Sequence, residues 1–266
     1  MFWPLYFLNI FMKKILFLII LVLVIYVLLN KDIEIIEADL PEPKDYKFFL
    51  VEEENLAQKD FSIPFKEQNE IITEIIKKEI NLNIPFISQA PTANWEQPYQ
   101  DACEEVSILM VDYYYTKKEP PSAEELEFFI QEMVKWQEEN WGEHLNLPII
   151  KLKEFVENYF NYKTEIIYDL NVEKIKNYLD RGIPVIVPAN GKKLDNPYFS
   201  NGGPEYHMLV IKGYLGDNFI TNDPGTKRGL NFIYTSENLL YSIADWDIKK
   251  SHVNMELKNG LIILLN

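Results

Sequence analysis

The single cysteine of the chain, Cys103, is the residue whose type most directly suggests chemistry. A lone cysteine cannot form an intrachain disulfide, so it is either a small buried apolar residue or a reactive thiol. It falls in the first turn of a predicted helix, where free backbone N–H groups and the helix dipole favour a thiolate. The neighbouring acids Asp101, Glu104 and Glu105 act against this, because negative charges raise a thiol pKa. Cys103 therefore needs a cationic partner to act as a nucleophile.

Of the three histidines, His207 is the best candidate for that partner. His144 and His252 stand in polar stretches, and both are predicted to be solvated turn residues. His207 instead begins an apolar strand, directly after the glycine-rich loop Gly202–Pro204. An imidazole held at the start of a strand can accept a proton from a thiol, as in other Cys–His nucleophile pairs.

Asp223 is the candidate acid that would orient this imidazole. A three-residue turn at Tyr214–Gly216, with Gly216 left-handed, would pair Gly213 with Asp217. On that register His207 stands directly opposite Asp223, close enough for the carboxylate to accept the imidazole N–H. Read without this pairing, Asp223 is an ordinary turn residue before a proline. The pairing favours a Cys–His–Asp triad.

The elements that must position these residues change in type along the chain. Periodicity and capping signals predict helices over residues 101–117, 122–139, 148–159 and 171–179. Apolar runs predict strands over residues 80–84, 164–168, 184–187, 207–214, 218–222 and 261–265. Helices come early and strands late, which predicts an α+β fold with helices packed on an antiparallel sheet.

The N-terminal segment is predicted to be a signal anchor. Fifteen apolar residues, Ile15–Leu29, follow Lys13-Lys14 and precede a run of acids. No small-residue cleavage site follows closely, so an uncleaved anchor is favoured over a cleaved signal peptide, with translation starting at Met1 or Met12. The expected location is a single-pass cell-membrane protein with an extracytoplasmic domain. The predicted parts are an anchor (1–29), a stalk (30–81) and the catalytic domain (82–266).

Composition and motifs argue against several other functions. The net charge is −15 and no basic stripe is present, so nucleic acid is not an expected partner. The chain has no HExxH motif, no cysteine pair and no glycine-rich phosphate loop, so neither a metal nor a cofactor is expected.

The order of the candidate residues resembles a known family. Pro85–Gln89, then Cys103, His207, Gly213-Tyr214 and Asp223-Pro224 are similar to the double-glycine (bacteriocin leader) peptidase-like family of the papain-like cysteine peptidase superfamily. The resemblance spans roughly residues 80–250. It implies a papain-like fold, with the cysteine on a central helix, the histidine and acid on the sheet, and a glutamine side chain that donates to the oxyanion.

Two features depart from the family pattern. The family often has glycine after the cysteine, where this chain has Glu104-Glu105, and the segment between Gln89 and Cys103 is long. An oxyanion donor must lie near the nucleophile. Gln89 matches the family pattern and is the first candidate; Gln97 is the second, and Gln100 is more simply a helix-entry residue.

These observations together predict a membrane-anchored cysteine peptidase with Cys103, His207, Asp223 and Gln89 as its catalytic residues. The expected partner is a peptide or protein substrate. Five aromatic residues either line a groove for it or belong to the core: Trp95, Tyr99, Tyr198, Phe199 and Tyr206. Two alternatives stay open: a cell-wall amide hydrolase of NlpC type, and a catalytically inactive peptidase-like binding module, which Glu104-Glu105 would suit.

Overall fold

The computed structural model describes residues 40–45, 79–144 and 146–265. The chain divides into two compact units, residues 1–41 and 42–266, and every helix and strand named below lies in the second. The predicted anchor and most of the stalk lie outside the described residues. None of the helices described is both long and apolar enough to cross a membrane. The predicted domain boundaries stay a prediction, although strand β1 begins at Glu79, before residue 82.

The first described helices come before most of the strands, and the later helices alternate with strands. The helices are α4 (Cys103–Thr116), α5 (Ala123–Trp141), α6 (Ile149–Phe155), α7 (Val172–Asp180), α8 (Gly191–Leu194) and α9 (Ser236–Ser242). Short helical turns add η1 (Tyr99–Asp101), the π-helix η2 (Val156–Phe160) and η3 (Ser200–Gly202). The strands are β1 (Glu79–Asn81), β2 (Lys163–Ile167), β3 (Val185–Ala189), β4 (His207–Leu215), β5 (Asn218–Asn222), β6 (Phe232–Thr235), β7 (Asp245–Asp247), β8 (His252–Asn254) and β9 (Gly260–Leu264).

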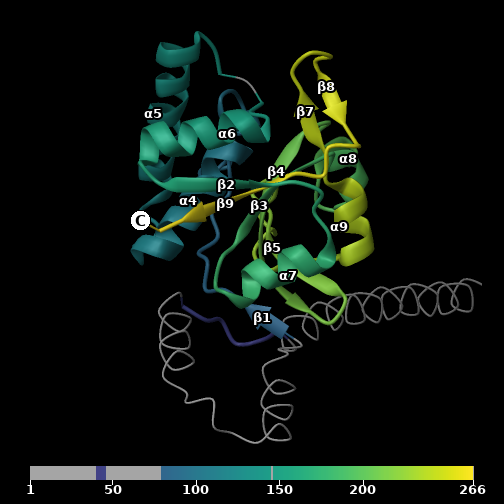
Figure 1. The fold of residues 1–266 in the computed structure, drawn as a ribbon. Helices are drawn as coiled ribbons and strands as arrows, with labels where there is room; N and C mark the ends of the chain where they lie inside the picture. The colour runs from purple at the N-terminus through teal and green to yellow at the C-terminus, as the bar shows by residue number, and fades with distance from the viewer. Residues whose placement is uncertain (1–39, 46–78, 145, 266) are drawn as a thin grey trace, which may run out of the picture. The chain divides into compact units, whose positions relative to one another are not determined.

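Seven strands form one antiparallel sheet in the order β2-β9-β3-β4-β5-β6, with β1 paired to β4. Strands β7 and β8 form a separate hairpin. In Figure 1, α5 and α6 lie above strand β2, and α8 and α9 lie to the right of the sheet. The predicted α+β fold with an antiparallel sheet is therefore confirmed.

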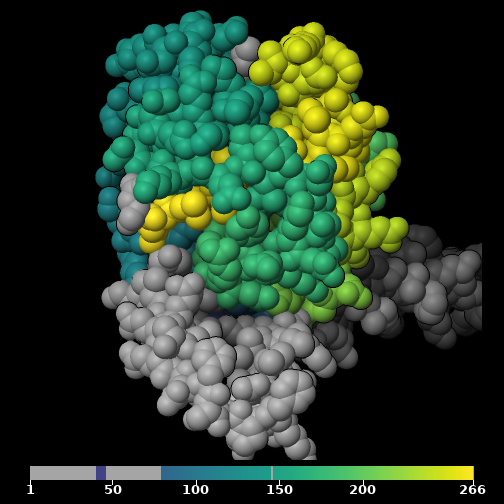
Figure 2. All heavy atoms as spheres, in the orientation of Figure 1, coloured from purple at the N-terminus to yellow at the C-terminus, as the bar shows by residue number. Residues whose placement is uncertain are grey.

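Helix α4 is the element that carries Cys103 into the core. Nearly all of its side chains are buried, and it packs against β4, the strand that begins with His207. Strand β9 is inserted between β2 and β3. The end of β9, in yellow, reaches the surface between segments from earlier in the chain (Figure 2). The last described strand is thus part of the sheet that positions the histidine.

The hairpin that joins β4 to β5 differs from the predicted one. Its loop has two residues rather than three, because Leu215 pairs with Asn218. Gly216 is left-handed, with φ 57°, as expected. A β-bulge at Lys212 then moves the pairing by one residue, so that Val210 faces Asn222.

The glycine after the bulge allows β1 to approach β4. A Cβ atom on Gly213 would lie 2.1 Å from the carbonyl oxygen of Ile80, so no larger residue fits without moving the backbone. The Lys212 carbonyl accepts a hydrogen bond from the backbone N–H of Leu82 at 2.8 Å. These contacts fix the segment that leads from β1 towards Gln89.

Candidate active site

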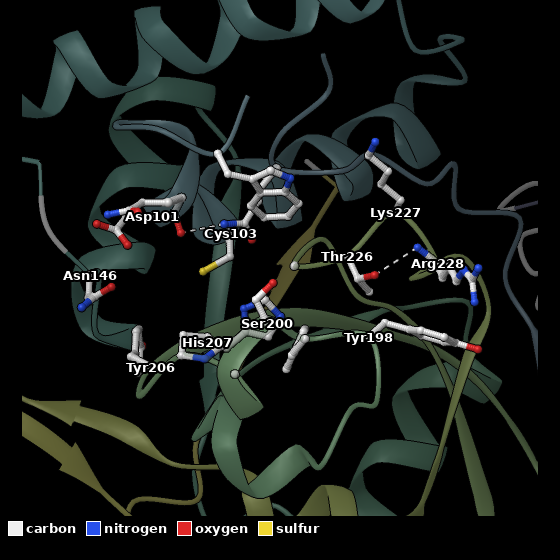
Figure 3. Close-up of a pocket in the computed structure, with 17 residues that line it drawn as sticks. Asp101, Cys103, Asn146, Tyr198, Ser200, Tyr206, His207, Thr226, Lys227 and Arg228 are labelled. Atoms are coloured by element: carbon white, nitrogen blue, oxygen red, sulfur yellow. Dashed lines mark hydrogen bonds between the residues drawn. The ribbon is translucent and has the colours of Figure 1, made fainter. Parts of the chain in front are cut away.

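Cys103 and His207 line the same cavity, which has a volume of about 610 Å³. Figure 3 shows the two side chains near its centre. The predicted oxyanion donor Gln89 also lines it. Four of the five aromatic residues singled out in the sequence contribute to the walls: Trp95, Tyr198, Phe199 and Tyr206. The fold therefore brings the sequence-predicted residues into one site.

The imidazole of His207 contacts the carboxylate of Asp223. Nε2 lies 2.8 Å from Oδ1, and both side chains are almost completely buried. The predicted direct pairing across the hairpin is wrong, because Val210 faces Asn222 and Asp223 follows the last residue of β5. The contact still forms because continuing the observed register puts Asp223 opposite Leu209, which shares a sheet face with His207.

Asp223 receives hydrogen bonds on both oxygens. Besides His207, Oδ1 accepts from the backbone N–H of Gly225 at 3.0 Å, and Oδ2 accepts from Tyr234 Oη at 2.7 Å and Asn196 Nδ2 at 3.1 Å. Burial alone would raise the pKa of Asp223, but the charge and hydrogen bond of His207 and the bonds from Tyr234 and Gly225 bring it below its usual value. The carboxylate is therefore ionised and accepts the Nε2–H of the imidazole.

The thiol of Cys103 is held by a different carboxylate. The sulfur lies 2.9 Å from Oε2 of Glu104, whose other oxygen accepts the backbone N–H of Leu147 at 2.8 Å. Burial, followed by the charges of Glu104 and Glu105, raises the pKa of Cys103 well above its usual value. The backbone of Met208 acts in the opposite direction. The thiol is thus protonated in this conformation, in agreement with the predicted effect of its acidic neighbours.

The two acids after the cysteine are buried rather than solvated. Burial, and next the charge of Glu105, raises the pKa of Glu104 to about 8. Oε1 of Glu105 accepts a hydrogen bond from Gln137 and lies 3.4 Å from Nε2 of His144. The prediction that His144 is solvated is wrong, because its side chain is only 8% exposed. Burial alone would lower the pKa of His144, but Glu105 and other nearby acids raise it.

The structure distinguishes between the candidate oxyanion donors Gln89 and Gln97. Gln89 is buried, and its Nε2 donates to the carbonyl oxygens of Tyr99 and Gln100 at 3.0 and 2.8 Å. Gln97 is absent from the described lining of the cavity, and its side chain donates to Asp101. Both amide hydrogens of Gln89 are engaged in this conformation, so its role as an oxyanion donor stays a prediction.

Sequence reasoning missed four residues of this region. Tyr234 and Asn196 hold Asp223 from distant parts of the chain, and no local pattern points to them. Lys227 and Arg228 also line the cavity. Their position shortly after the Asp-Pro turn was a signal that could have identified them. Among the described residues, no cluster of three or more histidine, cysteine or acidic side chains could hold a metal ion.

Comparison with protein families identifies the chain at the level of family. Residues 81–247 match the model of the Peptidase_C39 like family. The match covers more than half of the chain and includes the cysteine, histidine and aspartate described above. The chain belongs to this family. Membership confirms the resemblance seen in the sequence and supports a function of the cysteine peptidase type.

Among solved structures, the chain is similar to a C39-like peptidase from Bacillus anthracis, at 17% identity and a TM-score of 0.47, over 71% of this chain and 98% of the other. It is also similar to a double glycine motif protease from an AMS/PCAT transporter, solved in complex with the leader peptide. That similarity has 18% identity and a TM-score of 0.39, over 70% of this chain and 94% of the other. No curated protein matches the sequence.

Proposed function

We propose that the chain is a membrane-anchored cysteine peptidase that hydrolyses peptide bonds with Cys103, His207 and Asp223. The observation that supports this most is the 2.8 Å contact of His207 Nε2 with Asp223 Oδ1, beside a cavity that Cys103 and His207 line together. Since Asp223 accepts the proton on Nε2, the lone pair of the neutral imidazole is on Nδ1. A base and a nucleophile thus lie in one solvent-accessible site.

The reaction begins from a neutral thiol. His207 Nδ1 takes the proton of Cys103 as the sulfur attacks the peptide carbonyl carbon, and the imidazolium is stabilised by Asp223. The imidazolium then gives this proton to the leaving amine as the C–N bond breaks, which leaves a thioester on Cys103. Water attacks the thioester, and His207 moves the water proton to the departing sulfur. The thiol is thereby regenerated.

Negative charge on the carbonyl oxygen requires hydrogen-bond donors. The backbone N–H of Cys103 is one, since the first N–H groups of a helix have no partner within the helix. Gln89 supplies the second by exchanging one of its two carbonyl partners, Tyr99 or Gln100, for the oxyanion. Its backbone N–H, bonded to the carbonyl of Pro224 at 3.1 Å, keeps it beside the loop that follows Asp223.

Membrane anchoring by residues 1–29 is supported by the apolar run after Lys13-Lys14. Protease added to intact spheroplasts is expected to remove the domain, and a carbonate wash is expected to leave the protein on the membrane. A protected domain, or a mature chain that begins near residue 30, would contradict this part of the proposal.

A second candidate function is peptide binding without turnover. It is favoured by the contact of the thiol with Glu104, which keeps Cys103 protonated. Incubation with a mixed peptide library separates the two functions. A peptidase releases new amino termini, and both Cys103→Ala and His207→Ala abolish the release, whereas His252→Ala, at an exposed histidine, leaves it intact. Peptide retention by the wild-type protein with no new termini would favour the binding module.

A further inference from the structure

The loop Asp223–Gly229, which we name the catalytic-acid loop, is closed by hydrogen bonds at its base. The backbone N–H of Asp223 donates to the carbonyl of Gly229 at 2.9 Å. The side chain of Asp223 accepts from Gly225, and Thr226 Oγ1 accepts from the backbone N–H of Arg228 at 3.2 Å. The residue that orients the imidazole therefore also fixes the shape of this loop.

The catalytic-acid loop packs directly on the imidazole. A Cβ atom on Gly225 would lie 2.8 Å from Cε1 of His207, so the glycine allows the backbone to lie against the ring. Two further residues of this loop, Lys227 and Arg228, line the cavity and are exposed. Their positions are thus tied to the position of the catalytic base.

Lys227 and Arg228 lack carboxylate partners within the described part of the chain, although the protein carries a net charge of −15. The guanidinium of Arg228 lies over the ring of Tyr198, 4.8 Å from its centroid, which holds it at the cavity wall. Asp101 also lines the cavity, and Figure 3 shows it on the other side of Cys103 from the two cations. The cavity therefore has a basic end and an acidic end.

We propose that the basic end, Lys227 with Arg228, binds an acidic side chain of the peptide substrate close to the scissile bond. This inference rests on the proposed peptidase function and deepens it by naming the substrate class. A carboxylate can accept hydrogen bonds from a guanidinium with two oxygens at once, and such charge-assisted bonds are the strong ones. Asp101 repels an acidic side chain from the opposite end, so the enzyme selects peptides with an acid on one particular side of the cleaved bond.

The test uses a peptide from the mixed library that the wild-type protein either cleaves or retains, and each of its positions is changed in turn from Gln to Glu. At one position on one side of the cleaved bond, Glu is expected to raise kcat/KM by about tenfold over Gln. This increase corresponds to one charge-assisted hydrogen bond. The Glu/Gln ratio is expected to fall towards one in Lys227→Gln/Arg228→Gln. In Lys227→Glu/Arg228→Glu, a Lys peptide is expected to replace the Glu peptide as the preferred substrate. High salt should reduce the wild-type ratio.

A matched control removes an exposed lysine that does not line the cavity. Lys192→Gln has the same charge change as Lys227→Gln and is expected to keep the Glu/Gln ratio of the wild type. A wild-type ratio near one at every position, or a ratio that survives the double substitution, would overturn the inference.

Protection of Cys103 from iodoacetamide by the same peptides provides a readout that does not depend on cleavage. If Glu peptides protect Cys103 better than Gln peptides but none is cleaved, the proposed peptidase function fails and the inference on acidic ligands holds. If peptides are cleaved but Glu and Gln peptides behave alike in both assays, the function holds and the inference fails.

Discussion

Two buried carboxylates flank the candidate catalytic pair, and they differ in charge. Asp223, behind His207, accepts four hydrogen bonds, and its pKa is lowered. Glu104, beside Cys103, accepts from the thiol and from the backbone N–H of Leu147 and adjoins Glu105, and its pKa is raised to about 8. Both are fully buried. The number of donors and the sign of the neighbouring charge, rather than burial, therefore decide which of them is ionised.

The difference assigns separate roles to the two ends of the site. In the proposed reaction, an ionised Asp223 fixes the tautomer of His207 and stabilises its cationic form. Glu104 instead accepts a hydrogen bond from the protonated thiol, so the sulfur is not a free thiolate before a substrate binds. The predictions below test this contrast, first at the aspartate and then at the thiol.

Asp223→Ala should have the largest effect. Removing the acid of a triad typically lowers turnover by about 10²–10⁴-fold, and kcat/KM for peptide hydrolysis measures this. Asp223→Asn should lie between the wild type and Asp223→Ala, since an amide oxygen orients the ring but stabilises imidazolium less well.

Asn222→Ala is the matched control for Asp223→Ala. Its amide donates to the carbonyls of Ile84 and Pro85, away from His207. Its loss should reduce the free energy of unfolding by about 1–3 kcal/mol and leave most of the turnover. Turnover lost in Asn222→Ala but retained in Asp223→Ala would refute the assignment of the acid.

His207→Ala should slow the alkylation of Cys103 by iodoacetamide at pH 7 by at least roughly tenfold, because no base then takes the thiol proton during attack. The rate is measured by mass spectrometry of the Cys103 peptide, with His252→Ala as a control that alkylates like the wild type. Equal rates in His207→Ala and the wild type would show that His207 is not the partner of the thiol.

Glu104→Gln should change the same rate in the opposite direction. The amide oxygen can still accept the Leu147 N–H, but the charge that raises the pKa of Cys103 is gone. A decrease of about one pKa unit would accelerate alkylation by roughly tenfold at pH 9, where Glu104, with a pKa of about 8, is ionised in the wild type. Glu105→Gln, the control, should have a smaller effect because Glu105 does not contact the sulfur. Slower alkylation in Glu104→Gln would contradict the proposed contrast.

The last prediction concerns stability. Because the pKa of Glu104 is raised from 4.5 to about 8, the folded state binds more protons than the unfolded state between these values. The wild type therefore loses stability as pH rises through this window, whereas Glu104→Gln lacks that loss. The variant should gain roughly 1–4 kcal/mol relative to the wild type between pH 4 and pH 9, measured by urea unfolding. Parallel pH profiles of the two proteins would contradict a raised pKa.

The sequence predicted helices and strands well where the evidence lay in neighbouring residues. The capping box of α5 is present, with Ser122 and Glu125 bonded reciprocally, and β5 has the predicted bounds.

The environment of the thiol was only partly predictable. That Glu104 and Glu105 raise its pKa follows from adjacency, but their burial depends on Leu147 and Gln137, which come from other elements. His144 is buried beside Glu105, and its polar neighbours in the sequence do not reveal this burial.

The contact between His207 and Asp223 was predictable because family motifs and side-chain alternation both constrain these two residues. The predicted turn had the wrong length, yet Asp223 still contacts His207. Tyr234 and Asn196 complete the arrangement through long-range contacts that leave no mark on neighbouring residues. The basic end of the cavity was missed because Lys227 and Arg228 resemble any solvated pair of cations in an exposed turn.

The bulge at Lys212 makes the site sensitive to deletions in a way that substitutions do not reveal. Removing Lys212 would leave the pairs on both sides of the bulge unchanged, so His207 would stay on the same sheet face as Asp223. The deletion would instead remove the Lys212 carbonyl that accepts the N–H of Leu82, which a side-chain substitution leaves in place. A relative with one residue fewer here can therefore keep the base in place, but it must hold the segment that leads to Gln89 by another contact. Alignments and chimaeras of such proteins should keep the number of residues between His207 and Ile211 unchanged, because removing one of these would turn His207 away from Asp223.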